Sequence, residues 1–423
     1  MALACAALAA VSGCSRGPAQ PPAAPAADAP IALEVPGRTS LGPSIAALGT
    51  LTAVVWTAST DAVSDIYIAI SRDSGATFSA PARVNDLDGD ARASGEQPAR
   101  IAIGHGPVIH VVWPTRQDGI SQIRYASSSD LGRTFSKAVT VAGEKLSGAR
   151  GWESLALGWD GGVHLAWLDG RNAAPRPNHA HHGSHANPGA KTDSAPRQDV
   201  FHAAWKGAAA PAERQVAANV CFCCKTAIAT SGEKVYVAYR HIFPDSIRDI
   251  AVARSIDNGV TFEAPTRLSD DGWKIAGCPD DGPAMAADSH GGLHIAWPTF
   301  VEGETPRKGI FFASMAEGQA FTPRLRLDSG QADAAHPQIA ADDHGASAVV
   351  WDEHAAGARR IVLRRIDKGA AAAPEVFAAD GGLYPVVAAA EGHWVVVWSQ
   401  LGPDKRQVLA GRRLAFKNPS PEP

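Results

Sequence analysis

Short apolar runs that end in an aromatic residue recur along the chain at intervals of roughly fifty residues. They are Val54-Val55-Trp56, Val111-Val112-Trp113, Leu165-Ala166-Trp167, Val237-Ala238-Tyr239, Ile295-Ala296-Trp297, Val349-Val350-Trp351 and Val396-Val397-Trp398. A second apolar segment precedes each run, often after a proline, and polar loops and further short apolar segments follow it. Strands of this length separated by turns predict repeated four-stranded antiparallel sheets, which are the blades of a β-propeller.

The last repeat has no fourth strand of its own after the segment from Gln407 to Leu414, because a proline-rich end follows. The segment from Ile31 to Val35 can supply that strand and leave no sheet edge open. We therefore predict an all-β fold, a seven-bladed propeller over residues 31–415 that is closed by its N-terminal strand. Six blades are the alternative if one weak repeat belongs to a loop.

An eight-residue pattern, Ser-x-Asp-x-Gly-x-Thr-Phe, occurs at residues 71–78, 128–135 and 255–262, and a degenerate copy occupies residues 314–321. Each copy follows a short apolar run and is expected to form the turn between the third and fourth strands of a blade. The Asp side chain accepts hydrogen bonds from nearby backbone N–H groups, Gly adopts a positive φ, and Phe packs on the sheet. The pattern resembles the Asp-box (BNR repeat) of the sialidase-like β-propellers, where it has a structural role away from the substrate.

If the chain is an enzyme, this resemblance implies a glycosidase site of the exo-α-sialidase type. Such a site would hold a substrate carboxylate with arginines and use a Tyr activated by a Glu, with an Asp as acid. The candidates are Tyr384 as nucleophile, Glu153 beside it, Asp281 or Asp352 as acid, and Arg116, Arg150, Arg171 and Arg240 as substrate-binding residues. The Arg-Ile-Pro motif of the family is absent from the N-terminal region, which weighs against this activity.

Composition and the N-terminus restrict the partners. The chain has 39 basic and 43 acidic residues and a net charge of −4, with no basic cluster, so nucleic acid is not expected to bind. Residues 11–14, Val-Ser-Gly-Cys, resemble a bacterial lipobox, which predicts a signal peptide over 1–13 and lipidation of Cys14. An ordinary secretory signal is the alternative. Residues 14–30 are predicted to form a Pro/Ala-rich tether to the membrane, and residues 416–423 a disordered tail, which places the domain in the periplasm or at the cell surface.

Propeller topology sorts residues onto two faces. Loops that join strand two to strand three, or one blade to the next, should share the face opposite the Asp-box turns. Candidates on that face include Trp152, Lys225, His241, Asp280, His336, Glu353 and His354, together with the glycosidase candidates and four cysteines.

The four cysteines on this face are Cys221, Cys223, Cys224 and Cys278, in two segments that precede neighbouring blades. They are expected to converge and to form disulfides, or to bind a copper or zinc ion through thiolates. An extended backbone would point Cys224 away from Cys221 and Cys223. From this spacing we expect neither a zinc-ribbon nor a thioredoxin-type site.

A His-rich insert between residues 171 and 197 contains His179, His181, His182 and His185. Such tracts are a possible site for a metal ion, and the alternative is a solvated insert without a specific ligand. Three hypotheses for function follow. The first is a non-catalytic exported propeller that binds a glycan, metal or other ligand on the cysteine-bearing face. The second is a sialidase or related glycosidase, and the third is a docking scaffold for an envelope protein.

Overall fold

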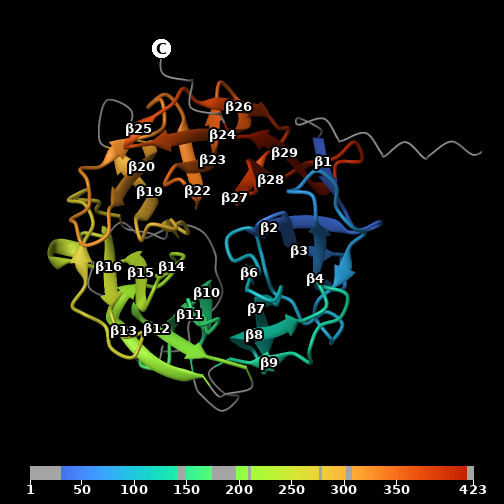
Figure 1. Ribbon diagram of the computed structural model, residues 1–423, viewed down its shortest axis with the longest axis horizontal. Coiled ribbons are helices and arrows are strands. Elements are labelled where there is room, and N and C mark those ends of the chain that lie inside the picture. Colours follow the sequence, from blue (N-terminus) through green and yellow to red (C-terminus); the bar gives the residue numbers. More distant parts are fainter. Residues whose placement is uncertain are drawn as a thin grey trace, which may run out of the picture.

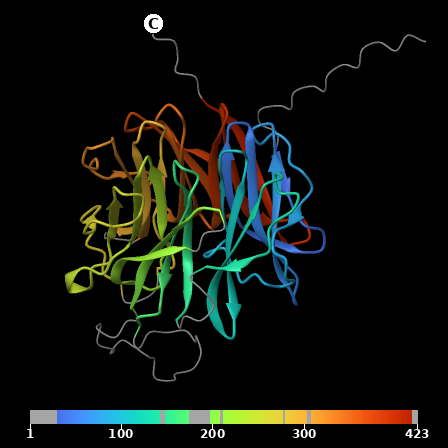
Figure 2. The ribbon, with the colours of Figure 1, turned by 60° about the horizontal axis from the view of Figure 1, so that its bottom comes forward.

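The computed structural model describes residues 30–141, 148–173, 197–207, 211–275, 279–301 and 307–416. Seven antiparallel sheets follow one another along the chain and are arranged around a central axis (Figure 1). Figure 2 shows the same ring tilted, with the strands of neighbouring blades side by side. The predicted all-β, seven-bladed propeller is thus confirmed, and the six-bladed alternative is wrong.

Blades 1 to 5 each consist of four strands in the order of the chain, with the first innermost, and blade 6 has a fifth strand. Blade 1 contains β2 (Thr39–Leu48), β3 (Leu51–Ser59), β4 (Ser64–Ser71) and β5 (Ala82–Arg83); blade 2 contains β6 (Arg100–Ile103), β7 (Ile109–Gln117), β8 (Ile120–Ser128) and β9 (Val139–Thr140). Blade 3 contains β10 (Arg150–Leu157), β11 (Val163–Asp169), β12 (Arg197–Trp205) and β13 (Ala212–Cys221); blade 4 contains β14 (Ala227–Ser231), β15 (Lys234–Arg240), β16 (Ile250–Ser255) and β17 (Thr266–Arg267). Blade 5 contains β18 (Ala284–Ala287), β19 (Leu293–Val301), β20 (Arg307–Met315) and β21 (Leu325–Arg326); blade 6 contains β22 (Asp333–Ala341), β23 (Ser347–Ala355), β24 (Ala358–Asp367), β25 (Ala370–Ala371) and the additional β26 (Glu375–Ala378). A short 3-10 helix, η2 (Pro244–Ser246), lies in blade 4 between β15 and β16.

Blade 7 combines the two ends of the described chain. Its strands β27 (Leu383–Ala390), β28 (His393–Leu401) and β29 (Gln407–Ala415) are completed by β1 (Pro30–Leu33). Strand β1 pairs antiparallel with β29, with Ile31 opposite Gly411 and Leu33 opposite Leu409. The closing strand therefore begins one residue before the predicted segment and ends two residues earlier, but it closes the ring as expected.

The aromatic-ended runs all lie in the second strand of a blade, where a strand has neighbours on both sides and is buried on both faces. Their terminal rings are almost inaccessible, with Trp56, Trp113, Trp167 and Trp297 at 0% exposure. The buried apolar side chains gather in seven layers, each shared by two adjacent blades. Burial between blades is therefore what holds the ring together.

The three octapeptide turns connect the third and fourth strands of blades 1, 2 and 4 and share one set of hydrogen bonds. In the first turn, the Ser71 hydroxyl donates to Asp73 at 2.7 Å and accepts from the Gly75 N–H at 2.8 Å. Asp73 also accepts from the Thr77 N–H at 2.9 Å. The same bonds recur in the turns at Ser128 and Ser255. Because these groups satisfy one another, the turn is a structural element, as the sequence predicted.

The predicted signal peptide, most of the tether and the tail after residue 416 lie outside the described residues. Among the residues that are described, no helix has the length and apolar character needed to cross a membrane.

Candidate functional site

The first strands of all seven blades line a channel along the axis of the ring. Near its middle the channel encloses a cavity of about 170 Å³. Its polar lining residues are Ser44, Arg100, Ser154, Thr226 and Gln338, and apolar residues such as Leu155, Met285 and Ile339 complete it. At about 30 Å³ per water molecule, this space would hold roughly six waters or one small ligand.

Arg100 is the cation of this cavity. It occupies the same register position as Ser44, Ser154 and Gln338, since each pairs with the residue directly before the buried aromatic of the second strand. Its Nε donates to the carbonyl of Glu153 at 3.1 Å, and burial lowers the pKa of Arg100 from its ordinary value. Within the described residues, no carboxylate forms a direct ion pair with the guanidinium, although the charge of Glu153 acts to raise the pKa of Arg100. Arg100 is half-buried, and a cation that is partly removed from water is costly without a compensating anion or water.

The channel widens toward the face that carries the octapeptide turns. There, a space of about 320 Å³ is lined mainly by small apolar residues, among them Ala47, Ala102, Ala287, Ala341 and Ala389. It shares Ile45, Ile101, Ile339 and Val387 with the central cavity, so the two spaces adjoin. A ligand can therefore approach Arg100 from this face.

The opposite end of the channel, on the cysteine-bearing face, is shaped by β-bulges in the first strands. The register of β10, β22 and β27 shifts where Trp152, His336 and Tyr384 stand, and these three have φ values of 60°, 56° and 53°. Left-handed backbone in bulky residues is unusual, and bulges commonly re-aim side chains at functional sites. Here the bulges place His336 and Tyr384 at the channel mouth.

His336 and Tyr384 close this mouth together with Glu96, which comes from the connection between blades 1 and 2. Glu96 Oε1 accepts from His336 Nε2 at 2.9 Å and from the Tyr384 hydroxyl at 3.3 Å. On its other side, His336 Nδ1 donates to Asp352 Oδ2 at 2.6 Å. The Tyr384 ring packs against His336, with 4.5 Å between centroids, and against Gly95, where a Cβ atom would lie 1.9 Å from the ring. These contacts join blade 2 to blades 6 and 7, and the remaining gap beside them measures about 10 Å³.

The charges of this bridge are fixed by its hydrogen bonds. Burial alone would lower the pKa of His336, but the hydrogen bonds to Asp352 and Glu96 and the charge of Asp281 raise it to about 9. The ring is therefore an imidazolium that donates through both nitrogens. Burial, reinforced by Glu96 and Asp352, raises the pKa of the Tyr384 phenol above its ordinary value. Tyr384 thus stays protonated, which disfavours it as a nucleophile.

A buried ion pair lies beside the bridge. Lys225 Nζ is 3.1 Å from Asp281 Oδ1, and the His336 N–H donates to Asp281 Oδ2 at 2.7 Å. Burial acts to raise the pKa of Asp281, but the charges of Lys225 and His336 outweigh it and hold the carboxyl well below its usual range. Asp281 therefore stays ionised and is unsuited to donate a proton. For the neighbouring Asp280, burial and the charge of Glu96 raise the pKa.

Glu153, the predicted partner of the tyrosine, is buried in blade 3. Burial raises its pKa to about 7 against the opposing charge of Arg100, and neither carboxylate oxygen has a hydrogen-bond partner within the described residues. The carboxylate that contacts Tyr384 is instead Glu96. Asp352, the other predicted acid, accepts from His336 and from Arg359 NH1 at 2.9 Å, and so belongs to the bridge.

The four predicted substrate-binding arginines are engaged elsewhere. Arg150 and Arg171 both contact Asp169 Oδ2, at 3.2 Å and 2.6 Å. Arg240 donates to the carbonyls of Arg248 and Pro298 and lies over the Trp273 ring. Arg116 is exposed and donates to the Gly119 carbonyl in the turn after β7. These contacts bring no carboxylate clamp together from the four residues.

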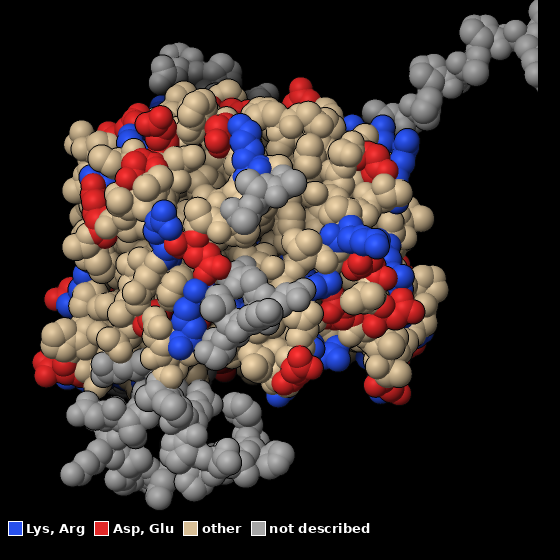
Figure 3. Space-filling model, turned by 90° about the horizontal axis from the view of Figure 1, so that it is seen from below, with Lys and Arg blue, Asp and Glu red and all other residues tan. Residues whose placement is uncertain are grey.

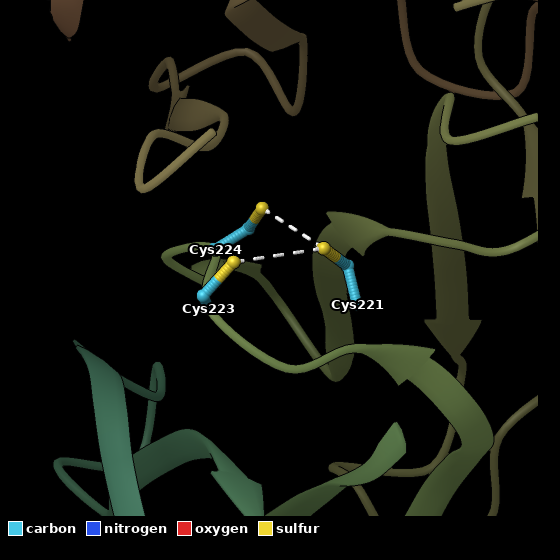
Figure 4. A group of neighbouring side chains, drawn as sticks. All are labelled: Cys221, Cys223 and Cys224. Atoms are coloured by element: carbon cyan, nitrogen blue, oxygen red, sulfur yellow. Dashed lines mark hydrogen bonds between the residues drawn. The ribbon is translucent and has the colours of Figure 1, made fainter. Parts of the chain in front are cut away.

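Three of the predicted cysteines do converge (Figure 4). Strand β13 ends at Cys221, and a turn then brings Cys224 back, so that their sulfurs are 3.4 Å apart. Cys223 Sγ lies 4.0 Å from Cys221 Sγ. All three are buried, at 1–3% exposure, and the half-buried Trp152 and Phe222 pack against them. The expectation that Cys224 points away is wrong, because the backbone is turned rather than extended.

Cys221 and Cys224 are free thiols, whereas Cys223 is not free. Cys278, the histidines of the insert (His179, His181, His182 and His185) and Cys14 lie outside the described residues. The expected convergence of Cys278 with the other three cysteines and the metal-binding role of the insert therefore stay predictions.

Sequence reasoning missed Glu96, Arg100 and the relation between two of the cysteines. Nothing local marks Glu96, because its partners are distant in the chain. Arg100 interrupts an otherwise uncharged first strand, Ala99-Arg100-Ile101-Ala102, and that break was an available signal. Cys221 and Cys224 have C-x-x-C spacing, which the tight grouping of three cysteines obscured.

The outer surface carries charges of both signs. Seen edge-on, Lys and Arg alternate with Asp and Glu over this side of the ring, and much of it is uncharged (Figure 3). This side therefore has no extended basic patch of the kind that nucleic-acid-binding proteins present.

Comparison with known proteins identifies the fold. No protein-family model and no curated protein sequence matches the chain. Among solved structures, it is similar to a protein of unknown function from Dyadobacter fermentans DSM 18053, with 13% identity, a TM-score of 0.52 and coverage of 92% of this chain and 98% of that one. It is also similar to a PL25 ulvan lyase bound to -[GlcA(1-4)Rha3S]-, with 10% identity, a TM-score of 0.52 and coverage of 88% and 92%. The Hadza microbial sialidase Hz136 matches with 12% identity, a TM-score of 0.49 and coverage of 90% and 66%. At such identities these likenesses concern the fold alone.

Proposed function

We propose that this propeller is a ligand-binding protein that holds the acidic group of a small sugar or related acid in its channel, at Arg100. The observation that carries the proposal is the Arg100 guanidinium, which borders a cavity of about 170 Å³ without an ion-pair partner among the described residues. A carboxylate or sulfate would compensate this charge through charge-assisted hydrogen bonds. The hydroxyls of Ser44, Ser154 and Thr226 and the Gln338 amide would complete the polar contacts.

The shape of the channel supports this proposal. The mouth on the cysteine-bearing face is bridged by Glu96, His336 and Tyr384, whereas the other end is wide. A ligand would enter through the alanine-lined end of the channel and direct its acidic group toward Arg100. The binding face is then opposite to the one the sequence analysis favoured. The ulvan lyase with a similar fold was solved with a saccharide that contains GlcA and Rha3S, so acidic saccharides are a reasonable first set of ligands.

The test is isothermal titration of the folded chain with glucuronate, galacturonate and N-acetylneuraminate, against glucose as the neutral sugar. We expect the acids to bind at least tenfold more tightly than glucose. Arg100→Gln should weaken their binding by about 10- to 100-fold, because a hydrogen bond to a charged group contributes about 1.5–3 kcal/mol. Arg116→Gln, at an exposed position near the end of β7 in the same blade, is the matched control and should leave the affinity unchanged. A preference for glucose, or unchanged binding in Arg100→Gln, would refute the proposal.

A glycosidase is the second candidate, and one observation favours it: the Tyr384 hydroxyl lies 3.3 Å from a carboxylate, that of Glu96. A tyrosine paired with a glutamate is the nucleophile that the sialidase resemblance implied. Against it stand the raised pKa of Tyr384 and the engagement of the four arginines in other contacts. We therefore expect no efficient release of sialic acid from a fluorogenic sialoside. Turnover that is lost in both Tyr384→Phe and Arg240→Ala would establish the glycosidase instead.

We also propose that the chain is exported and anchored through a lipid on Cys14. The support is the lipobox-like Val-Ser-Gly-Cys sequence at residues 11–14 and the Pro/Ala-rich segment that follows. Metabolic labelling with palmitate in a bacterial host should mark the protein, and Cys14→Ser should abolish the label. Labelling that persists in Cys14→Ser would refute the assignment.

A further inference from the structure

The buried thiols of Cys221 and Cys224 lie at the junction of blades 3 and 4. Cys221 is the last residue of β13, and Cys224 lies three positions before the first residue of β14. The Cys224 thiol donates to Cys221 Sγ at 3.4 Å, and each residue is 1% exposed. Two free thiols are thus held face to face away from water.

Two of the cysteine sulfurs at this position are available to bind a metal ion. Within the described residues, the cysteine group is the one place where three metal-ligating side chains have their ligand atoms within 4.8 Å of one another. Cys223 has another partner, so the group offers two thiols for a metal. Zn(II) in structural sites takes four ligands, whereas thiolates select soft ions such as Cu(I).

The surroundings of the two thiols carry positive charge. Arg248 NH1 donates to Cys221 Sγ at 3.7 Å. Arg240 is 1% exposed, lies over the Trp273 ring at 4.3 Å and donates to two backbone carbonyls, so its guanidinium is fixed nearby. Two thiolates with one monovalent cation carry a net charge of −1, and buried guanidinium groups compensate that charge.

We propose that Cys221 and Cys224 form a two-thiolate binding site for one Cu(I) ion. On binding, each sulfur loses its proton to solvent and forms one bond to copper, and copper enters and remains as Cu(I), so no electron is transferred. Trp152 and Phe222 cover the sulfurs and exclude water. Both rings are themselves half-buried, so the site lies beneath a single layer of side chains. This site is independent of the proposed ligand at Arg100.

The test uses the full chain with Cys5 and Cys14 replaced by serine, titrated anaerobically with Cu(I) in competition with bicinchoninate. We expect one equivalent to bind, and Cys221→Ser or Cys224→Ser to lower the affinity at least 100-fold. Cys223→Ser and the replacement of all four histidines of the insert by asparagine are the controls, and each should change the affinity less than tenfold. Circular dichroism checks that every variant folds.

X-ray absorption provides a second readout, and we expect copper with two sulfur neighbours. A coordination by three sulfurs together with lost binding in Cys223→Ser would overturn the two-thiol assignment. Binding that disappears with the histidines would place the copper in the insert. Absence of binding, with Cys221 and Cys224 found joined in a disulfide by mass spectrometry, would show a covalent link between the blades in place of a metal site.

Discussion

The closing strand β1 offers the most direct test of how the ring is stabilised. Ile31 and Leu33 are 6% and 5% exposed and pack in the layer between blades 7 and 1. Truncating a buried Ile or Leu to Ala costs about 2–5 kcal/mol, and the lower end applies to a strand at the outer edge of a sheet. The double variant Ile31→Ala, Leu33→Ala should therefore lower the free energy of unfolding by about 4 kcal/mol.

Removing the strand altogether should cost more. A chain that begins at Gly37 loses both side chains and the pairing of four residues with β29. Each lost hydrogen bond adds about 0.5–1.5 kcal/mol, and the edge of β29 is left open. The total approaches the 5–15 kcal/mol that is typical of a whole folded protein. We expect the truncated chain to unfold at a much lower urea concentration or to aggregate.

The assay is urea denaturation followed by tryptophan fluorescence. Ala32→Ser is the matched control, because Ala32 lies in the same strand with its side chain exposed, and it should shift stability by less than about 0.5 kcal/mol. An unchanged midpoint for the chain that begins at Gly37 would refute the reasoning, since the ring would then be stable without its closing strand.

Four further predictions follow from the turns, the bridge and the buried acid. Ser71→Ala should cost about 1–3 kcal/mol, because it leaves the buried Gly75 N–H unpaired, while Ser314→Ala in the degenerate turn should be nearly neutral in the same urea assay. The pKa of His336 is raised to about 9, so the protonated ring stabilises the fold fully below about pH 6.5, and this stabilisation is lost as the pH rises through 9. In urea midpoints measured against pH, His336→Asn should not show this loss. The pKa of Glu153 is raised from 4.5 to about 7, so its ionisation lowers the stability of the fold as the pH rises from 4.5 to 7. At a pH above 7, Glu153→Gln should therefore have a higher urea midpoint than the unchanged chain. An equal midpoint would contradict the burial of a carboxylate without a hydrogen-bond partner. Gly95→Ala should displace the Tyr384 ring and lower the thermal midpoint, because the added Cβ would overlap that ring. An unchanged midpoint would show that the bridge tolerates a side chain at Gly95.

The fold was predictable because its signals are local and repeated. The aromatic-ended strands recur seven times, and the missing fourth strand of the last repeat pointed to Ile31 as part of the closing strand. The same holds for the octapeptide turns, whose hydrogen bonds stay within eight residues. Patterns of this kind depend little on the rest of the molecule.

The site was less predictable because it depends on the closed ring. Glu96 and His336 are 240 positions apart and meet only where the blades converge. Whether Arg150 faces a ligand or an internal carboxylate depends on how adjacent strands lie, and here it contacts Asp169. The position of the cysteines at a blade junction was predicted correctly. The direction of the Cys224 side chain, however, depends on a turn, and the alternation of side chains along an extended strand does not apply to a turn.

The division of the apolar interior into seven separate layers has a consequence for evolution. A substitution in one layer is felt by the two blades that share it and hardly by the others, so effects in distant layers should add. Each junction between blades can then accumulate substitutions independently of the others, provided that it remains apolar and of similar volume. Such independence explains how chains with 13% identity or less retain one architecture. It also leaves the residues that line the channel free to vary, so that one propeller can acquire different ligands without a change in the packing between its blades.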